Sequence, residues 1–260
     1  MSPTSGLSDT TRKGLVLASL LLLSWLISLV SLLTLRVTAW PWWLILAAVL
    51  ARTALHTGLF ITAHDAMHGV LIPGQSQWND RVGMVCLALY AGLPYQACRH
   101  NHHLHHSRTA TEDDPDFHDD PQAGVIGWYV RFMAGYLSLA QMGRLLGFWS
   151  LLVVGISAIN PMGWLNLLLF CTLPLLLSSG QLFVFGTYLP HRHQRGPGGQ
   201  RQPESLGHPP WLSLLTCFHF GYHREHHDHP QLAWFELPAK RRLSRPLASC
   251  LTTRVASQRA

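Results

Sequence analysis

Charged side chains are scarce in this 260-residue sequence. Asp, Glu, Lys and Arg together make up 12% of it, hydrophobic residues make up 48%, and residues 145–191 contain none of the four charged types. This composition excludes an ordinary soluble domain and indicates that lipid solvates much of the chain. The net charge is +6, but the basic residues are scattered, and no basic helix with interleaved aromatic residues occurs. Nucleic acid is therefore not an expected partner.

Three further absences narrow the class of protein. The five cysteines are widely spread and form no C-x-x-C pair, which argues against a disulfide framework or a zinc knuckle. The apolar run at 14–35 has no A-x-A-like exit, so it is expected to be a retained membrane span and not a secretory signal. No Gly-rich dinucleotide fingerprint follows a strand. Any electrons that the protein uses must therefore come from a separate donor.

Long hydrophobic runs predict an all-α integral membrane protein that forms a single domain, 1–260. A helix needs ~20 apolar residues to cross a bilayer, and we expect four spans at about 15–35, 41–63, 142–159 and 163–189. The sequence Asn-Pro-Met-Gly at 160–163 is a natural turn between the last two spans, and Pro174 should bend the last one. The short run 82–93 suits an interfacial or re-entrant piece, and the amphipathic segment 125–147 suits an interfacial helix.

The basic residues give an independent check on these spans. Four spans place the N-terminus, the region 64–144 and the tail from His191 on one side of the membrane. Of the 19 Lys and Arg residues, all except Arg36 and Arg52 then lie on that side, which the positive-inside rule identifies as the cytosol. Every histidine except His56 lies on or near the same side. The regions 64–141 and 190–260 are therefore expected to form a cytosolic, histidine-rich cap on the membrane.

Three histidine clusters lie in that cap. On a helix, residues i, i+3 and i+4 share a face, so H-x₃-H presents two imidazoles together and H-x-x-H-H presents three. The sequence contains one cluster of the first kind and two of the second; the facing histidines are His64 and His68; His102, His105 and His106; and His223, His226 and His227. These eight side chains are candidate metal ligands, and His191, at the end of the last span, is a candidate ninth.

The number of ligands favours two metal ions. Eight imidazoles exceed the four ligands of a structural zinc, and imidazole accepts Zn, Cu, Fe or Ni, so the ligand type does not name the element. A dinuclear redox metal that activates O₂ matches the ligand number best. His103 and His219 lie near the clusters but off their facing positions, and each is a candidate for ligation or for a supporting role.

Acidic residues could orient the metal-binding histidines. A histidine that binds metal usually donates its other ring N–H to a carboxylate or a carbonyl, and the candidates for this role are Asp65, Asp114, Asp116 and Glu225. Arg52 and His56 stand four apart in the middle of the second span. Ionisable groups there are often functional; alternatively Arg52 extends to the far membrane surface and His56 packs as a neutral ring.

Several strings around the clusters carry a family resemblance that covers nearly the whole chain from about residue 55. They are FITAHDAMHG at 60–69, HHLHH at 102–106, DPDFH at 114–118, FGTYLPH at 185–191, LTCFHF at 215–220 and ELP at 236–238. The histidine clusters alone resemble the membrane fatty-acid-desaturase-like superfamily, and the flanking strings resemble its bacterial β-carotene ketolases.

This resemblance implies a particular chemistry. Such enzymes use O₂, a di-iron centre and external electrons, plausibly from ferredoxin, to oxidise ring carbon 4 of β-ionone rings to a ketone. Two hydroxylations and loss of water would give echinenone and canthaxanthin, or astaxanthin if hydroxylated rings are accepted. A carotenoid hydroxylase and a fatty-acid desaturase share the same histidine pattern and stay open as alternatives. A metal transporter is a remote alternative, since transport should place ligands near the middle of the bilayer.

Overall fold

The computed structural model describes residues 7–118, 124–193 and 202–244, and in this part of the chain the regular elements are all helices, joined by loops, without strands. Four helices are long and apolar enough to cross a membrane: α1 (Asp9–Thr34), α2 (Trp42–Met67), α6 (Leu139–Ser157) and a continuous helical stretch, Gly163–His191. The expected fold class and the four spans are confirmed, with ends that differ from the expected ones by a few residues. The outer residues 1–6 and 245–260 of the expected single domain lie outside the described part.

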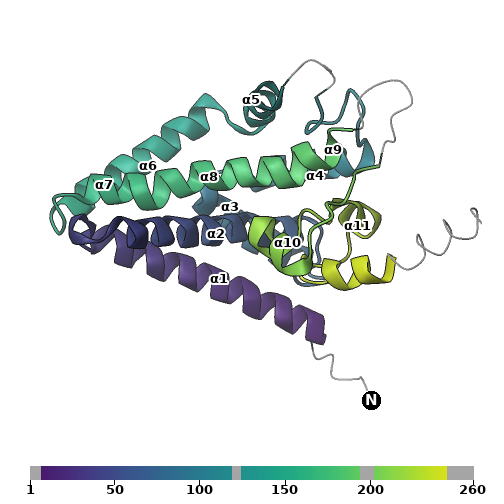
Figure 1. Cartoon of the computed structure of the whole chain (residues 1–260), viewed down its shortest axis with the longest axis horizontal. Coiled ribbons are helices and arrows are strands. Elements are labelled where there is room, and N and C mark those ends of the chain that lie inside the picture. Colours follow the sequence, from purple (N-terminus) through teal and green to yellow (C-terminus); the bar gives the residue numbers. More distant parts are fainter. Residues whose placement is uncertain (1–6, 119–123, 194–201, 245–260) are drawn as a thin grey trace, which may run out of the picture.

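The arrangement of the helices gives the molecule two distinct ends. At one end lie the N-terminus of α1, α4 (Tyr95–Ser107), α9 (Leu189–His191) and α11 (His223–Asp228); at the other lie the connection between α1 and α2 and the turn before α7 (Gly163–Leu167) (Figure 1). All three histidine clusters therefore belong to the same end. At the opposite end, η1 (Val37–Ala39) leads into α2, where the exposed Trp42 and Trp43 suit a membrane–water boundary.

The second helix forms the centre of the bundle. It packs against α1, α3 (Ser76–Ala91) and α8 (Leu173–Leu182), and the half that leads to the histidines is almost wholly buried. By contrast, α1 and α6 expose most of their apolar side chains. Exposed apolar helix faces are stable where lipid replaces water, so these two helices form the lipid-facing side of the bundle.

The last span is one helical stretch with two irregular turns. It contains α7, a π-helical turn η2 (Leu168–Thr172), α8, a second π-helical turn η3 (Phe183–Tyr188) and α9. Pro174 follows η2 and Pro190 follows η3, and neither has an N–H for the carbonyl four residues earlier. The disturbance expected at Pro174 therefore takes the form of a widened turn just before it, and π-helical turns are common near functional sites.

The interfacial segments differ from their expected bounds. The helix expected over 82–93 is longer: α3 runs from Ser76 to Ala91 and ends at Gly92, whose φ of 64° suits a residue without a Cβ. The segment expected as one interfacial helix over 125–147 is divided into α5 (Val125–Tyr136) and the start of α6. Ser138 and Gln141 form a capping box there. A serine three residues before a glutamine is a recognised helix start, and it separates the two helices.

Arg52 and His56 are fully packed in the bundle, so the expectation that Arg52 extends to the far surface is wrong. Arg52 is 1% exposed. Its Nε donates to the carbonyl of Phe170 (3.0 Å), which has no helical hydrogen bond from Pro174 because proline lacks an N–H, and its Nη1 donates to the carbonyl of Trp25 (2.7 Å). His56 Nδ1 accepts from the Trp25 indole N–H (3.0 Å), and Nε2 donates to the Tyr90 carbonyl (2.7 Å). These bonds fix a neutral His56 and link α1, α2, α3 and the last span.

Candidate metal centre

The first two histidines occupy the last turn of α2. His64 and His68 share one helix face, and α2 ends at His68 because Gly69, with φ 71°, reverses the chain. The Gly69 N–H donates to the Ala66 carbonyl (3.0 Å), and the Val70 N–H donates to the Asp65 carbonyl (3.1 Å). This pair of bonds is a Schellman motif. The glycine in the string FITAHDAMHG thus fixes the end of the helix directly beside its two imidazoles.

The other candidate ligands come from α4, α11 and the end of the last span. His102, His105 and His106 lie on α4, His223, His226 and His227 lie on the short α11, and His191 lies at the end of α9. Although the chain separates these helices widely, the structure gathers their imidazoles into two groups, in each of which one nitrogen per ring lies within 4.8 Å of those of the others. The first group is His64, His68, His102, His106 and His226; the second is His105, His191, His223 and His227.

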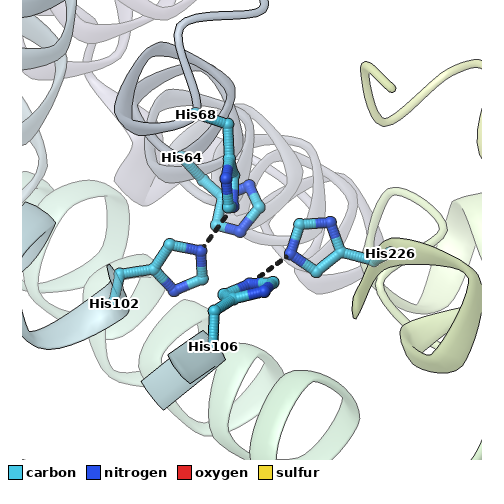
Figure 2. Close-up of side chains that lie close together, drawn as sticks. All are labelled: His64, His68, His102, His106 and His226. Atoms are coloured by element: carbon cyan, nitrogen blue, oxygen red, sulfur yellow. Dashed lines mark hydrogen bonds between the residues drawn. The ribbon is translucent and has the colours of Figure 1, made fainter. Parts of the chain in front are cut away.

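Each H-x-x-H-H cluster is divided between the two groups. On α4 the i, i+4 pair His102 and His106 joins the first group and His105 the second; on α11 the i, i+4 pair His223 and His227 joins the second group and His226 the first. Figure 2 shows the five rings of the first group pointing toward a common centre from α2, α4 and α11. Each of these two clusters therefore contributes histidines to both groups.

Ring nitrogens face one another at short distances within and between helices. The Nε2 atoms of His68 and His102 lie 2.7 Å apart, and those of His106 and His226 lie 2.9 Å apart (Figure 2). In the second group, His227 Nε2 lies 3.1 Å from the Nε2 atoms of both His105 and His223. Converging nitrogens of this kind satisfy one another poorly, because each neutral ring has only one N–H to donate. They suit a cation at the centre of each group.

The electrostatics of the groups favour neutral rings. Burial, followed by the charges of neighbouring histidines, lowers the pKa of His102 and His226 well below its ordinary value, and the same causes act on His223 and His227. Neutral imidazole is the form that binds metal. The donor set therefore fits metal ions in both groups, and imidazole is a ligand that iron accepts.

His105 is held differently from the other rings. Burial acts to lower its pKa, but the hydrogen bond that its Nδ1–H donates to Asp114 and the charges of Asp116 and Asp114 outweigh burial and raise it. Asp114 Oδ1 lies 2.8 Å from His105 Nδ1, and both side chains are buried. The carboxylate thereby turns Nε2 toward the second group, which is the orienting role expected for an acidic residue beside a metal-binding histidine.

The remaining acidic candidates have different partners. Asp65 Oδ1 lies 3.8 Å from His64 Nδ1, and Asp65 Oδ2 accepts a hydrogen bond from the backbone N–H of Trp234 (3.3 Å). Glu225 differs from the expectation, because its carboxylate pairs with Arg241 (2.9 Å) and accepts from Ser205 and thus anchors α11. Asp116 accepts a hydrogen bond from the Tyr136 hydroxyl (2.8 Å).

His103 and His219 lie outside both groups. His103 Nε2 is bonded to the Met67 carbonyl (3.1 Å), which places the ring against the end of α2. His219 stacks on Tyr222 and Trp234, and its backbone lies in the left-handed region at φ 66°. The ring next to it in the chain, Phe220, lies against His64 and His226 and so covers one side of the first group.

Two adjoining cavities approach the histidines from the bundle. The smaller, of about 50 Å³, is lined by histidines of both groups and by Asp116, Phe60, Phe132, Tyr136 and Leu182. The larger, of about 200 Å³, lies between α2, α3, α5, α6 and α8 and is lined almost wholly by apolar and aromatic side chains. Phe60, Phe132, Tyr136 and Leu182 line both. Together these cavities connect an apolar space inside the bundle to the two histidine groups.

Comparison with known proteins gives the class of this protein. The model of the fatty acid desaturase family matches residues 38–253, and the chain belongs to that family. It is 40% identical over 207 residues to the "Beta-carotene ketolase" of Haematococcus lacustris (77% of this chain, 63% of that one), and 40% identical over 238 residues to the "Beta-carotene ketolase" of Paracoccus sp. (strain N81106 / MBIC 01143) (90% and 94%). The resemblance to β-carotene ketolases that the flanking strings indicated is thus confirmed.

A third relative is an algal enzyme with a different printed substrate. The "Zeaxanthin 4-ketolase" of Chlamydomonas reinhardtii is 36% identical over 237 residues, which are 86% of this chain and 50% of that one. The chain therefore spans less than two thirds of the length of these algal relatives and nearly all of the Paracoccus protein. No solved structure matches the chain.

Reasoning from the sequence missed the apolar and aromatic residues that line the cavities, among them Tyr136 and Phe220. Tyr136 and Phe220 line the smaller cavity, but an aromatic residue on an interfacial helix or in a loop carries no pattern that marks it. Phe220 falls within the string LTCFHF, so the resemblance could have drawn attention to it. Tyr136 gave no signal, because its role depends on how α5 packs against α4 and the last span.

Proposed function

We propose that this chain is a β-carotene 4-ketolase: a membrane oxygenase that converts ring carbon 4 of a β-ionone ring to a ketone. The observation that carries the proposal is the junction of two histidine groups with an apolar cavity inside a bundle of the desaturase family. The names of the relatives support the choice of a carotenoid substrate and of carbon 4. The products would be echinenone and canthaxanthin, and astaxanthin where zeaxanthin is accepted.

The reaction consumes external electrons. Each hydroxylation takes one O₂, two electrons and two protons, inserts one oxygen atom into a C–H bond and releases the other as water. Two hydroxylations at carbon 4 give a geminal diol, which loses water to leave the ketone. Because the sequence has no dinucleotide fingerprint, we propose that a separate donor, a ferredoxin, supplies the electrons at the end of the bundle that holds the histidines.

The residues of this chain would divide the remaining tasks. His64, His68, His102, His106 and His226 would hold one iron ion, and His105, His191, His223 and His227 the other. When bound, the two ions supply the activation of O₂ and the removal of an allylic hydrogen, a step that protein side chains do not perform. Asp114 keeps His105 oriented. Phe60, Phe132 and Leu182 place the ring against the histidines and keep water from it.

Expression in cells that accumulate β-carotene, followed by chromatography of the pigments, tests the reaction. We expect 4-keto products, and cells that contain only 3-hydroxy carotenoids would reject the ketolase proposal. Elemental analysis of active, natively isolated protein tests the metal. About two iron ions per chain are expected, and zinc as the sole stoichiometric metal would reject the di-iron proposal.

We also propose that the end of the bundle with the histidines faces the cytosol. The basic residues of the sequence support this orientation through the positive-inside rule. Reporter fusions in bacteria test it: a fusion after residue 244 should report a cytosolic position and one in the connection between α1 and α2 a periplasmic position. The reverse pattern would reject the orientation and leave the proposed reaction untouched.

A further inference from the structure

A carboxylate and a phenol stand at the junction of the two cavities. The Tyr136 hydroxyl, on the last residue of α5, donates to Asp116 Oδ1 at 2.8 Å. Tyr136 lines both cavities, and Asp116 lines the smaller one beside His105. Phe60, Phe132 and Leu182, the other residues common to the two cavities, are apolar. The pair therefore puts one polar feature on the path that a ring would take toward the histidines.

The Asp116 side chain is not needed to hold its own loop. The backbone N–H of Asp116 donates to Asp114 Oδ1 (2.9 Å), and its carbonyl accepts from the Trp128 indole N–H (2.9 Å). Both bonds would remain if the side chain were replaced. Of its two carboxylate oxygens, Oδ1 serves Tyr136, whereas Oδ2 accepts no hydrogen bond from the described residues. Because Asp116 lines the smaller cavity, this oxygen can accept a hydrogen bond from a molecule that enters it.

Asp116 also stands apart from the candidate ligands. Neither group of converging ligand atoms includes it or any other carboxylate of the described residues. It lies close enough to His105 for its charge to affect that ring, and it faces the same small cavity. Its place is therefore beside the reacting position and not at the centre of either histidine group.

We propose that Asp116, fixed by Tyr136, binds the hydroxyl group of the ring alcohol that the first oxidation produces. This inference rests on the proposed function and explains why that reaction would proceed to a ketone. After the first hydroxylation, carbon 4 carries an O–H group, and Asp116 is the one carboxylate among the residues that line the smaller cavity. Donation of this O–H to Asp116 Oδ2 retains the alcohol and leaves the remaining hydrogen on carbon 4 directed toward the histidines. Without that bond, the alcohol leaves before the second oxidation.

The expected size of the effect follows from the loss of one hydrogen bond in a largely apolar site. The wild-type chain should prefer the 4-hydroxy carotenoid to β-carotene by about tenfold more than a variant that lacks this acceptor. Asp116→Leu removes the acceptor, Asp116→Asn keeps a neutral one, and Tyr136→Phe frees the carboxylate from its anchor. The preference for the alcohol should therefore fall from wild type through Asn to Leu.

Binding without turnover is the first measurement. The purified full-length proteins are kept anaerobic and without an electron donor, and the quenching of tryptophan fluorescence gives the Kd for β-carotene and for the 4-hydroxy carotenoid. We expect Asp116→Leu to lose about tenfold in relative preference for the alcohol while its Kd for β-carotene changes less than about twofold. Tyr129→Phe is the matched control, because it removes another hydroxyl of α5, one that is bonded to Ser179 (2.6 Å). It should leave the preference unchanged.

The products in carotene-accumulating cells are the second measurement. The Asp116 variants should release 4-hydroxy carotenoid in place of much of the ketone and retain wild-type iron content. Equal preference for the alcohol in wild type and Asp116→Leu would overturn the inference, as would loss of iron from Asp116→Asn, which would make Asp116 a ligand. A wild-type chain that forms no ketone would instead reject the proposed function, so the two failures are distinguishable.

Discussion

Helix α2 and its C-terminal cap residue, His68, carry two pairs of polar residues with the same spacing but different partners. Arg52 and His56 stand four apart in the middle of the helix, and His64 and His68 stand four apart at its end. Both His56 nitrogens are bonded to an indole N–H or a backbone carbonyl, whereas His68 Nε2 faces another imidazole at 2.7 Å. Spacing and burial therefore do not identify a metal ligand. What distinguishes the second pair is that its nitrogens converge on other nitrogens.

Removal of a converging ring should have the largest effect on function. His64→Ala and His226→Ala each remove a nitrogen from the first group, and we expect ketone formation to fall by more than about 100-fold, since even the loss of a residue behind a ligand costs about 10–100-fold. Iron per chain should fall as well. Pigment chromatography and elemental analysis measure the two effects.

The matched control is His193→Ala. His193 is exposed and pairs with the exposed Glu204, and such surface pairs contribute little. Wild-type turnover is expected for it. Wild-type turnover in His64→Ala or His226→Ala would instead show that the converging rings are not the metal site.

Asp114 should have the next largest effect, because it orients a ring of the second group without entering that group. Asp114→Asn keeps the shape of the side chain but removes the charge that holds His105 Nδ1 at 2.8 Å. A loss of about 10–100-fold in activity or metal affinity is expected. Titration with iron under anaerobic conditions would distinguish a loss of metal affinity from a loss of activity. Unchanged affinity together with unchanged turnover would contradict an orienting role.

Glu225 tests whether an acidic residue inside a histidine cluster must support a ligand. Its partners are Arg241 and Ser205, so Glu225→Gln should lower stability more than turnover. Removal of one member of a buried ion pair costs about 3–5 kcal/mol, and the melting temperature in detergent should fall. If the ion pair is the main role, Glu225→Gln should destabilise a chain that already carries Arg241→Gln much less than it destabilises the wild type. A loss of iron as large as that in Asp114→Asn would place Glu225 beside a metal after all.

The sequence predicted the helical membrane fold well because hydropathy and helix period are local properties. It also predicted which rings would share a face on each helix. It could not predict how the rings divide, since His102, His105 and His106 lie on one turn, and only the packing of α4 between α2 and α11 sends His105 to the other group. The partner of Glu225 was equally hidden, because Arg241 follows it by 16 residues and no periodic pattern joins them. Tyr136 depends on tertiary packing alone.

The smallest effect on function is expected for replacement of His56, the histidine of α2 whose two ring nitrogens are both hydrogen-bonded. In His56→Leu the apolar packing is kept, but the Trp25 N–H and the Tyr90 carbonyl lose their partner. Each buried group left unsatisfied costs about 1–3 kcal/mol, so thermal unfolding should occur at a lower temperature. Iron per folded chain and turnover per iron should nevertheless equal those of the wild type, because His56 belongs to neither histidine group. Loss of iron in this variant at a temperature where it stays folded would mean that the two polar pairs of α2 are coupled, and that the middle of the bundle contributes to the metal centre.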